Sequence, residues 1–355
     1  MSYDGLNLLP QLKSFPTADL DLKCTSLDLL PRLGARLDIE LFVKRDDTLP
    51  LAMGGNKIRQ LEYYLGPAVR DGADTLLITG AVQSNFVRLC AAAACKLGMK
   101  AVVQLEDRVP KDDAVYNSSG NVLLNHLLGA EIHHFSEGED EAAADANLDR
   151  MADELRAKGH RPYVVHLGID FPALGGLGYA RCAAECFMQF KEMDAMPDHV
   201  VIPSGSGLTH AGFLAGARAI GWDVPLHGIC VRRDAAQQHP RVARRAAEVC
   251  AMLGGDWVKP DDILVNDEVL APGYGQLNDQ VIAALSYAAK DEALLLDPVY
   301  TGRTMAGLIA LIEGGLINSG SRVAFIHTGG LPSIFAYQSD IVSSLNNLET
   351  KEGVL

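Results

Sequence analysis

The sequence predicts an α/β protein with mostly parallel sheets flanked by helices, and three observations lead to this fold class. Short apolar segments alternate with helical patterns through most of the chain, as in parallel strands joined by crossover helices. With 355 residues and 48% hydrophobic content, the chain can build two lobes and a large core. Polar residues follow several apolar segments, at the strand ends where open α/β sheets bind ligands.

Eight segments are expected to form strands because each is a short apolar run next to a helical pattern. The alanine-rich run 89–97 and the apolar run 211–220 are expected helices. The acidic stretch 137–154 fits the solvated face of another helix, and we assign it no function. The expected strands are residues 41–44, 75–79, 101–105, 131–135, 162–166, 200–202, 226–231 and 322–327.

The net charge of the chain limits the partners that it can bind. With 31 basic and 45 acidic residues it carries −14, whereas nucleic acids and anionic membranes require a positive surface. We therefore expect a small-molecule substrate, with neither nucleic acid nor membrane as a partner. The sequence opens without a signal peptide pattern and has no apolar run of about 18 residues, which predicts a cytoplasmic protein.

Neither the cysteines nor the histidines predict a metal site. The seven cysteines form no C-x-x-C pair, so we expect neither a disulfide framework nor a zinc site. Cys182 and Cys186 stand four residues apart in a helical pattern and are expected to pack in the core. The histidines at 133, 134, 210 and 327 match no zinc spacing.

Lys57 stands behind two glycines and an asparagine, where an amphipathic helix is expected to begin. Gly54 and Gly55 allow the backbone to approach a bound group closely. Ile58, Leu61 and Leu65 share one helical face, which would hold the lysine rigidly. An isolated segment of this kind favours a solvated lysine after a glycine turn. Other segments of the chain reverse that interpretation.

The segment 204–209 predicts a binding site for phosphate. Its small residues Ser-Gly-Ser-Gly-Leu-Thr follow an expected strand and precede an apolar helix. Free backbone N–H groups and the helix dipole favour an anion there. The chain has neither a Walker lysine in this loop nor a G-x-G-x-x-G segment with an acidic residue about 20 positions later, so the phosphate is not expected to belong to a nucleotide.

Seven short blocks occur through nearly the whole chain. They are KRDD at 44–47, GGNKIRQLE at 54–62, GAVQSN at 80–85, SGSGLTHAG at 204–212, PGYG at 272–275, DPVYTG at 297–302 and HTGG at 327–330. With these blocks the chain resembles the pyridoxal-phosphate enzymes of the tryptophan synthase β type (fold type II), and within these the group of D-cysteine desulfhydrase and 1-aminocyclopropane-1-carboxylate deaminase. The blocks follow the order found in that family.

The resemblance implies a two-lobed fold in which each lobe is an open, mostly parallel sheet flanked by helices. A small lobe of residues 58–170 would be inserted into a large cofactor-binding lobe made of residues 1–57 and 171–355. Lys57 would then lie at the junction of the lobes, where ligand clefts commonly form. The resemblance also implies a homodimer.

The resemblance assigns roles to individual residues. Lys57 matches the family's Schiff-base lysine, and an amine with a lowered pKa can act as nucleophile or base. Ser84 matches the serine that receives the substrate carboxylate or relays a proton. Tyr274 and Tyr300 match two tyrosines near the reacting atoms, where a phenol can donate a proton to a leaving group. The catalytic candidates are Lys57, Ser84, Tyr274 and Tyr300.

The same resemblance predicts how pyridoxal phosphate is held. Asn85 matches the asparagine that hydrogen-bonds the phenolic oxygen of the cofactor. Thr301 stands where the deaminase pattern has an acidic residue, and its hydroxyl polarises the ring nitrogen less than a carboxylate does. This difference favours β-elimination over cyclopropane ring opening. The remaining cofactor-binding candidates are Asn56, Ser204, Gly205, Ser206, Gly207, Leu208 and Thr209.

The expected function is that of a pyridoxal-phosphate-dependent lyase, which removes the α-proton and the β-substituent of a small amino acid and yields pyruvate and ammonia. D-cysteine is the leading substrate, with L-cysteate and other β-substituted alanines as variants. Ring-opening deamination and a non-catalytic cofactor-binding protein are the alternatives. Departures from the family pattern at Gln60, Phe86, Leu208 and 166–169 leave the substrate open.

Overall fold

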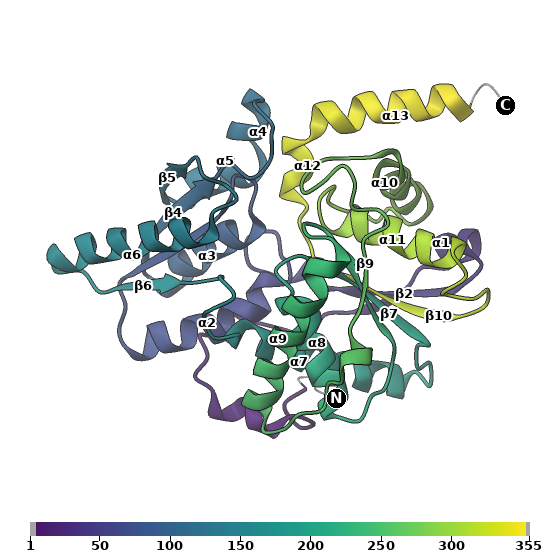
Figure 1. Ribbon diagram of the computed structural model, residues 1–355, viewed down its shortest axis with the longest axis horizontal. Coiled ribbons are helices and arrows are strands. Elements are labelled where there is room, and N and C mark those ends of the chain that lie inside the picture. Colours follow the sequence, from purple (N-terminus) through teal and green to yellow (C-terminus); the bar gives the residue numbers. More distant parts are fainter. Residues whose placement is uncertain (1–4, 353–355) are drawn as a thin grey trace.

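The protein folds into two sheets that lie side by side, each flanked by helices (Figure 1). This computed structural model describes residues 5–352. Segments from both ends of the chain meet in the larger sheet, at the right in Figure 1. None of the helices between residues 5 and 352 has the length and apolar character needed to cross a membrane.

The larger sheet has six strands in the order β1-β2-β10-β7-β8-β9. Only β1 runs antiparallel to its neighbour, β2, and the other pairs are parallel. The strands are β1 (Leu27–Leu29), β2 (Glu40–Arg45), β7 (His199–Ser204), β8 (Leu226–Cys230), β9 (Leu264–Asn266) and β10 (Arg322–His327).

The smaller sheet has four parallel strands in the order β5-β4-β3-β6. All of them lie within the lobe 58–170 that the sequence predicts as an insertion, although its boundaries stay a prediction. The strands are β3 (Thr75–Ala81), β4 (Lys100–Glu106), β5 (Glu131–Phe135) and β6 (Pro162–Val165).

The predicted fold class is confirmed, and all eight expected strands are present with ends within two residues of the expected ones. Two strands, β1 and β9, were missed. Each has three residues, lies at an edge of the larger sheet and is partly exposed. A strand this short gives no periodic signal in the sequence.

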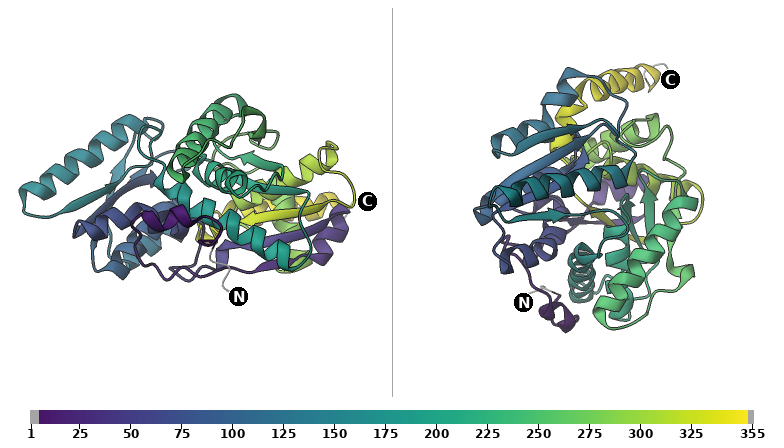
Figure 2. Two further views of the ribbon diagram at one scale, coloured as in Figure 1. Left: turned by 90° about the horizontal axis from the view of Figure 1, so that it is seen from below. Right: turned by 60° about the vertical axis from the view of Figure 1, so that its left-hand side comes forward.

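Helices cover the faces of both sheets (Figures 1 and 2). Helix α6 lies along the outer side of the smaller sheet, and α7, α8 and α9 pack together against the larger one. The helices are α1 (Pro31–Leu37), α2 (Lys57–Arg70), α3 (Asn85–Leu97), α4 (Ala114–Ser118), α5 (Gly120–Leu127), α6 (Glu141–Ala157), α7 (Leu174–Glu192), α8 (Leu208–Ala219), α9 (Ala235–Leu253), α10 (Asp279–Glu292), α11 (Thr301–Glu313), α12 (Pro332–Ala336) and α13 (Gln338–Glu352).

Helix α2 is fixed on the side that faces away from the cavity. Its residues Ile58, Leu61 and Leu65 are fully buried, as their shared helical face predicts. Helix α7 approaches its backbone so closely that a Cβ on Gly178 would lie 2.0 Å from the carbonyl oxygen of Arg59. The backbone of Lys57, the first residue of α2, is therefore held in a fixed position.

Candidate active site

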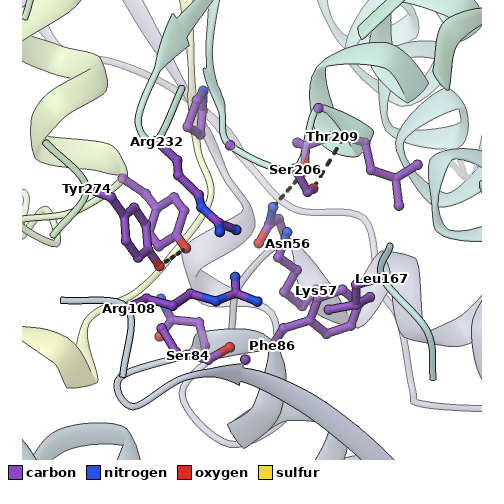
Figure 3. A pocket seen from close by; sticks show the side chains of 18 of the residues that line it. Asn56, Lys57, Ser84, Phe86, Arg108, Leu167, Ser206, Thr209, Arg232 and Tyr274 are labelled. Atoms are coloured by element: carbon purple, nitrogen blue, oxygen red, sulfur yellow. Dashed lines mark hydrogen bonds between the residues drawn. The ribbon is translucent and has the colours of Figure 1, made fainter. Parts of the chain in front are cut away.

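A cavity lies between the two sheets, and loops from both of them line it (Figure 3). Strands β3 and β4 from the smaller sheet and β7 and β8 from the larger one end beside it. Helices α2, α3 and α8 begin there. Carboxyl ends of parallel strands are where open α/β sheets bind ligands, and the cavity follows that rule.

Lys57 projects into the cavity from the first turn of α2. Gly54 and Gly55 precede it with φ of +68° and +122°, values that favour glycine. A Cβ on Gly54 would also lie 2.0 Å from the carbonyl oxygen of Asp47. Burial lowers the pKa of the Lys57 amine to about 8, because the charged form is disfavoured away from water. A significant fraction of this amine is therefore neutral near physiological pH and can accept a proton.

The loop before α8 faces the start of α2 across the cavity. Gly207 is the N-cap of α8 with φ of +84°, and the first-turn N–H groups of a helix lack partners within the helix. The hydroxyl of Thr209 accepts hydrogen bonds from Asn56 Nδ2 at 3.0 Å and from Gln60 Nε2 at 2.8 Å. These bonds join the first turn of α8 to the start of α2 and hold Lys57 and the α8 N-terminus in one fixed arrangement.

Ser84 and Asn85 open helix α3 at the opposite wall. Ser84 Oγ is the N-cap and accepts a hydrogen bond from the Val87 N–H at 3.2 Å. Asn85 Oδ1 accepts one from Asn121 Nδ2 at 3.0 Å. Its amide nitrogen is therefore the group left to donate into the cavity.

Tyr274 and Tyr300 share a hydrogen bond, with their hydroxyl oxygens 2.8 Å apart (Figure 3). Tyr274 comes from the loop between β9 and α10, and Tyr300 is the N-cap of α11. Burial raises the pKa of Tyr300 well above its ordinary value, with the neighbouring Tyr274 adding to the effect. This phenol stays protonated at neutral pH, so the pair can supply a proton to a group bound beside it.

Five arginines also line the cavity, and the sequence analysis missed all of them. They share no motif, but three come two or three residues after the end of a strand, at the sheet edge where polar residues were expected to gather. That position is the signal that could have identified them. Arg108 follows β4, Arg232 and Arg233 follow β8, and Arg241 and Arg245 lie on α9.

Two carboxylates accept hydrogen bonds from three of these arginines. Glu141, the first residue of α6, accepts hydrogen bonds from Arg232 at 2.7 Å and from Arg233 at 2.6 Å. Glu106 pairs with both Nε and Nη2 of Arg108, at 2.7 and 2.8 Å. Burial alone would raise the pKa of the Glu141 carboxyl, but the guanidinium groups of Arg233 and Arg232 hold it below its usual range.

Comparisons with known proteins agree with this geometry. The family described as "Pyridoxal-phosphate dependent enzyme" matches residues 19–329. The chain belongs to the pyridoxal-phosphate-dependent enzymes. It is 41% identical to D-cysteine desulfhydrase from Salmonella choleraesuis over 94% of this chain and 99% of that protein. It is 42% identical to D-cysteine desulfhydrase from Klebsiella pneumoniae over 93% of this chain and 98% of that one.

Solved structures of this enzyme class have the same fold. A homologue of 1-aminocyclopropane-1-carboxylate (ACC) deaminase matches with a TM-score of 0.84 and 31% identity, over 97% of this chain and all of the other. Threonine deaminase isoform 2 from Solanum lycopersicum matches with a TM-score of 0.64 and 16% identity over 97% of this chain and 89% of the other, which supports the fold alone. The predicted family, cofactor and enzyme class, a lyase, are thereby confirmed.

The cavity of this pyridoxal-phosphate enzyme offers what the cofactor requires. When bound, pyridoxal phosphate withdraws electrons from the α-carbon of an amino acid. Lys57 offers an amine with a lowered pKa, and the α8 N-terminus offers N–H groups for a phosphate. The buried Oε1 of Gln60 has no hydrogen-bond partner among the described residues, so a polar atom beside the phosphate loop still needs one.

Two residues predicted to bind the cofactor do not line the cavity. Ser204 is the last residue of β7, and its hydroxyl contacts Gln238 Nε2 at 2.8 Å and His210 Nδ1 at 3.2 Å. The hydroxyl of Thr301 donates to Asp297 Oδ1 at 2.8 Å. Their roles toward the cofactor stay predictions. The other predicted site residues all line the cavity: Asn56, Lys57, Ser84, Asn85, Gly205, Ser206, Gly207, Leu208, Thr209, Tyr274 and Tyr300.

The positions that depart from the family pattern fall into two groups. Phe86 lines the cavity and lies beneath Lys57, whose Nζ is 5.1 Å from the ring centroid. Leu167 also lines it. His166 instead contacts Asp145 and Asp149 at 3.1 Å each and stacks on Phe171. It stabilises the loop that presents Leu167.

Proposed function

We propose that this enzyme catalyses α,β-elimination on a small β-substituted amino acid, with D-cysteine as the leading candidate. The products would be pyruvate, ammonia and the released β-substituent, which is hydrogen sulfide in the case of D-cysteine. The observation that carries the proposal is the presence of a base and an acid in one cavity. Lys57 has an amine with a pKa of about 8, and the tyrosine pair holds a proton across from it.

Each group has one task in the proposed reaction. Lys57 removes the α-proton of the substrate. Ser84 receives the substrate carboxylate at the start of α3, where the helix dipole favours an anion. Asn56, Asn85 and the loop 205–209 hold the cofactor.

The tyrosines serve the leaving group. Loss of the β-substituent leaves negative charge on its sulfur, and Tyr274 or Tyr300 can donate the proton that neutralises it. Because Tyr300 resists ionisation, the pair does not lose that proton to water before the substrate is bound. Either hydroxyl can act as donor in the bond that joins the two.

Ring opening of ACC is the rival reaction, because the deaminase homologue shares this fold. Two features favour elimination. Residue 301 is a threonine, and its hydroxyl is already engaged by Asp297. The relatives at 41–42% identity are named desulfhydrases.

Product identity tests the proposal. The enzyme is incubated with D-cysteine, L-cysteine and ACC, and the keto acids are separated chromatographically. We expect pyruvate from a cysteine and no 2-oxobutyrate from the cyclic amino acid. Lys57→Ala should abolish pyruvate formation, while Arg244→Gln, on the exposed side of α9, should not change it. Formation of 2-oxobutyrate without pyruvate would contradict elimination and show that the enzyme opens the ring of ACC instead.

We also propose that the enzyme acts in the cytoplasm as a homodimer with an inserted lobe of residues 58–170. The four-stranded sheet supports the position of that lobe, since its strands lie between residues 75 and 165. Sedimentation of the purified enzyme at several concentrations tests the dimer. A single species with the mass of one chain, 38.1 kDa, would contradict it.

A further inference from the structure

The cavity is cationic although the chain as a whole is strongly acidic. The full sequence carries a net charge of −14. Four arginines lie on the side of the cavity next to the tyrosines, where the described lining residues supply the carboxylates of Glu106 and Glu141 and the exposed carboxylate of Glu139. A concave site with an excess of one charge attracts ligands of the opposite charge. These arginines are Arg108, Arg232, Arg233 and Arg241.

Arg108 and Arg232 reach into the cavity from the two different sheets. Figure 3 shows their guanidinium groups pointing toward one another, between Tyr274 on one side and Lys57 on the other. Both side chains are largely buried, with 16% and 11% exposed. Their carboxylate partners are already in place, so no rearrangement is needed before a ligand binds.

Each of the two guanidinium groups keeps a donor for a ligand. Arg108 uses Nε and Nη2 on Glu106, which leaves Nη1. Arg232 uses Nη1 on Glu141 and Nη2 on Glu139, which leaves Nε. Neither of these remaining groups has an acceptor within residues 5–352. Guanidinium donors of this kind suit an anion with several oxygens.

Neither the cofactor phosphate nor the substrate carboxylate accounts for this pair. The phosphate loop has its own arginines, since Arg241 donates to the carbonyl oxygen of Ser206 at 2.9 Å and Arg233 contacts that of Gly205 at 3.4 Å. The α-carboxylate is proposed to bind at Ser84. Arg108 instead lies on the side of the cavity that carries Tyr274 (Figure 3). The unassigned donors therefore lie where the β-substituent would be.

We propose that Arg108 and Arg232 bind a tetrahedral oxyanion on the β-carbon of the substrate, such as the sulfonate of cysteate. The proposal rests on the proposed function and specifies its substrate class. Lys57 takes the α-proton, the bond between Cβ and sulfur breaks, and both electrons of that bond leave with sulfite. No oxidant or reductant is required. A phosphate ester such as O-phosphoserine has the same oxyanion chemistry, with inorganic phosphate as the leaving group.

A comparison of kcat/KM between substrates provides the first test. Pyruvate formation is measured for both enantiomers of cysteine and cysteate and for O-phosphoserine, with sulfite and phosphate assayed separately to identify the oxyanion. We expect a higher kcat/KM for an oxyanion substrate than for cysteine. In Arg232→Gln, kcat/KM for that substrate should fall at least about tenfold further than kcat/KM for cysteine, mainly through KM. Arg232→Lys should recover part of the loss.

Arg232 is the better position to vary because Glu141 keeps Arg233 as a partner when Arg232 is replaced. In contrast, replacing Arg108 would leave the fully buried Glu106 without its guanidinium partner. Arg244→Gln is the matched control. This arginine lies on α9 beside Arg245, has a half-exposed side chain and does not line the cavity.

A binding measurement on the loaded enzyme gives a second readout that does not depend on turnover. 3-Sulfopropionate has the carboxylate and sulfonate of cysteate but no amine, and butyrate carries the carboxylate alone. By titration calorimetry, the enzyme should bind 3-sulfopropionate more tightly than butyrate. Arg232→Gln should weaken 3-sulfopropionate binding at least about tenfold. Arg244→Gln should match the unmodified enzyme.

The outcomes separate this proposal from the function on which it rests. Pyruvate from cysteine but from no oxyanion substrate, with equal 3-sulfopropionate affinity in Arg232→Gln, would overturn the oxyanion site and leave the elimination intact. No pyruvate from any substrate would reject the proposed function, while calorimetry would still decide whether the arginines bind the sulfonate. Loss of cofactor in Arg232→Gln without a change in preference would assign Arg232 to the phosphate and overturn the proposal.

Discussion

Lys57 combines a fixed backbone with an amine that has been made easier to deprotonate. Its neighbour Ile58 is fully buried, and its own Nζ lies over the Phe86 ring. No carboxylate within the described residues pairs with the amine to oppose the effect of burial, which lowers its pKa to about 8. The aromatic face offers a weak attraction for the charged form without abolishing the shift.

This shift predicts the pH dependence of Lys57 modification. In protein stripped of cofactor, a small amine-reactive reagent should label Lys57 faster as the pH rises, because only the neutral amine reacts. The rate should level off above about pH 8, whereas an unperturbed lysine has a pKa near about 10.4. Mass spectrometry of a digest measures each lysine separately, and the other lysines serve as internal references. A Lys57 rate that still climbs steeply above about pH 9.5 would contradict the lowered pKa.

The tyrosine pair can be tested by removing one hydroxyl at a time. Tyr274→Phe and Tyr300→Phe should each lower kcat by about 10²- to 10⁴-fold, the usual range for a positioned general acid. The cofactor spectrum should remain unchanged, because neither hydroxyl is expected to hold the cofactor. Tyr287→Phe is the control, since Tyr287 packs against Arg36 away from the cavity. Equal activity in all three variants would remove the pair from the chemistry.

At the scale of single elements, the start of helix α3 performs two tasks through Ser84. Its hydroxyl caps the helix by accepting the Val87 N–H, and the same residue is proposed to receive the substrate carboxylate. An alanine substitution affects both tasks at once. Loss of a cap of this kind costs about 1 kcal/mol of stability.

Ser84→Asp separates the two tasks, because aspartate caps helices as well as serine does but repels a carboxylate. We expect Ser84→Ala to lower both Tm and kcat/KM. Ser84→Asp should keep Tm close to that of the unmodified enzyme and raise KM strongly. Thermal denaturation and steady-state kinetics on the same preparations measure both properties. An unchanged KM in Ser84→Asp would place the carboxylate elsewhere.

The elements that the sequence predicted best are those with a complete apolar pattern. Strand β3 is buried along its whole length, and both its position and its polar C-terminal loop were predicted. Strands β1 and β9 have three residues each and pair on one side only, so neighbouring chain segments decide their structure. The cofactor site could also be predicted, because the loops that follow parallel strands meet at one edge of the sheet whatever their length.

The arginine cluster could not be predicted from charge alone. Charged residues usually face solvent, and most of α6 follows this rule, as the acidic stretch 137–154 predicted. Glu141 is the exception, because the first turn of α6 points toward β8 and meets Arg232 and Arg233 there. These contacts join residues 91 and 92 positions apart, so no local pattern encodes them.

For the molecule as a whole, a buried charge network fixes α2 to the larger sheet. Arg59, two residues after Lys57, contacts Asp46 at 2.8 Å and Glu185 of α7 at 2.9 Å. Lys44 of β2 also pairs with Glu185, at 2.5 Å. All four side chains are at most 2% exposed. The network therefore holds the segment that carries Lys57 against β2 and α7, opposite the cavity.

Glu185 makes the stability that this network contributes depend on pH. Burial by itself would raise the pKa of its carboxyl, but Arg59 and Lys44 hold it at about 2. An unfolded glutamate has a pKa near about 4.3, so the unfolded state binds more protons between these values. The stabilisation is therefore complete above about pH 4.3 and is lost as the pH falls toward about 2.

Glu185→Gln should remove this dependence and weaken the fold at neutral pH. Replacing one partner leaves Arg59 and Lys44 with less buried negative charge, and breaking such a network costs about 3–5 kcal/mol. Urea denaturation from about pH 7 to about pH 3 should give a steep loss of unfolding free energy in the unmodified protein and a flatter profile in the variant. Glu154→Gln is the control, because its surface pair with Arg150 contributes at most about 0.5 kcal/mol. Parallel pH profiles for all three proteins would mean that Glu185 does not anchor α2 through its charge.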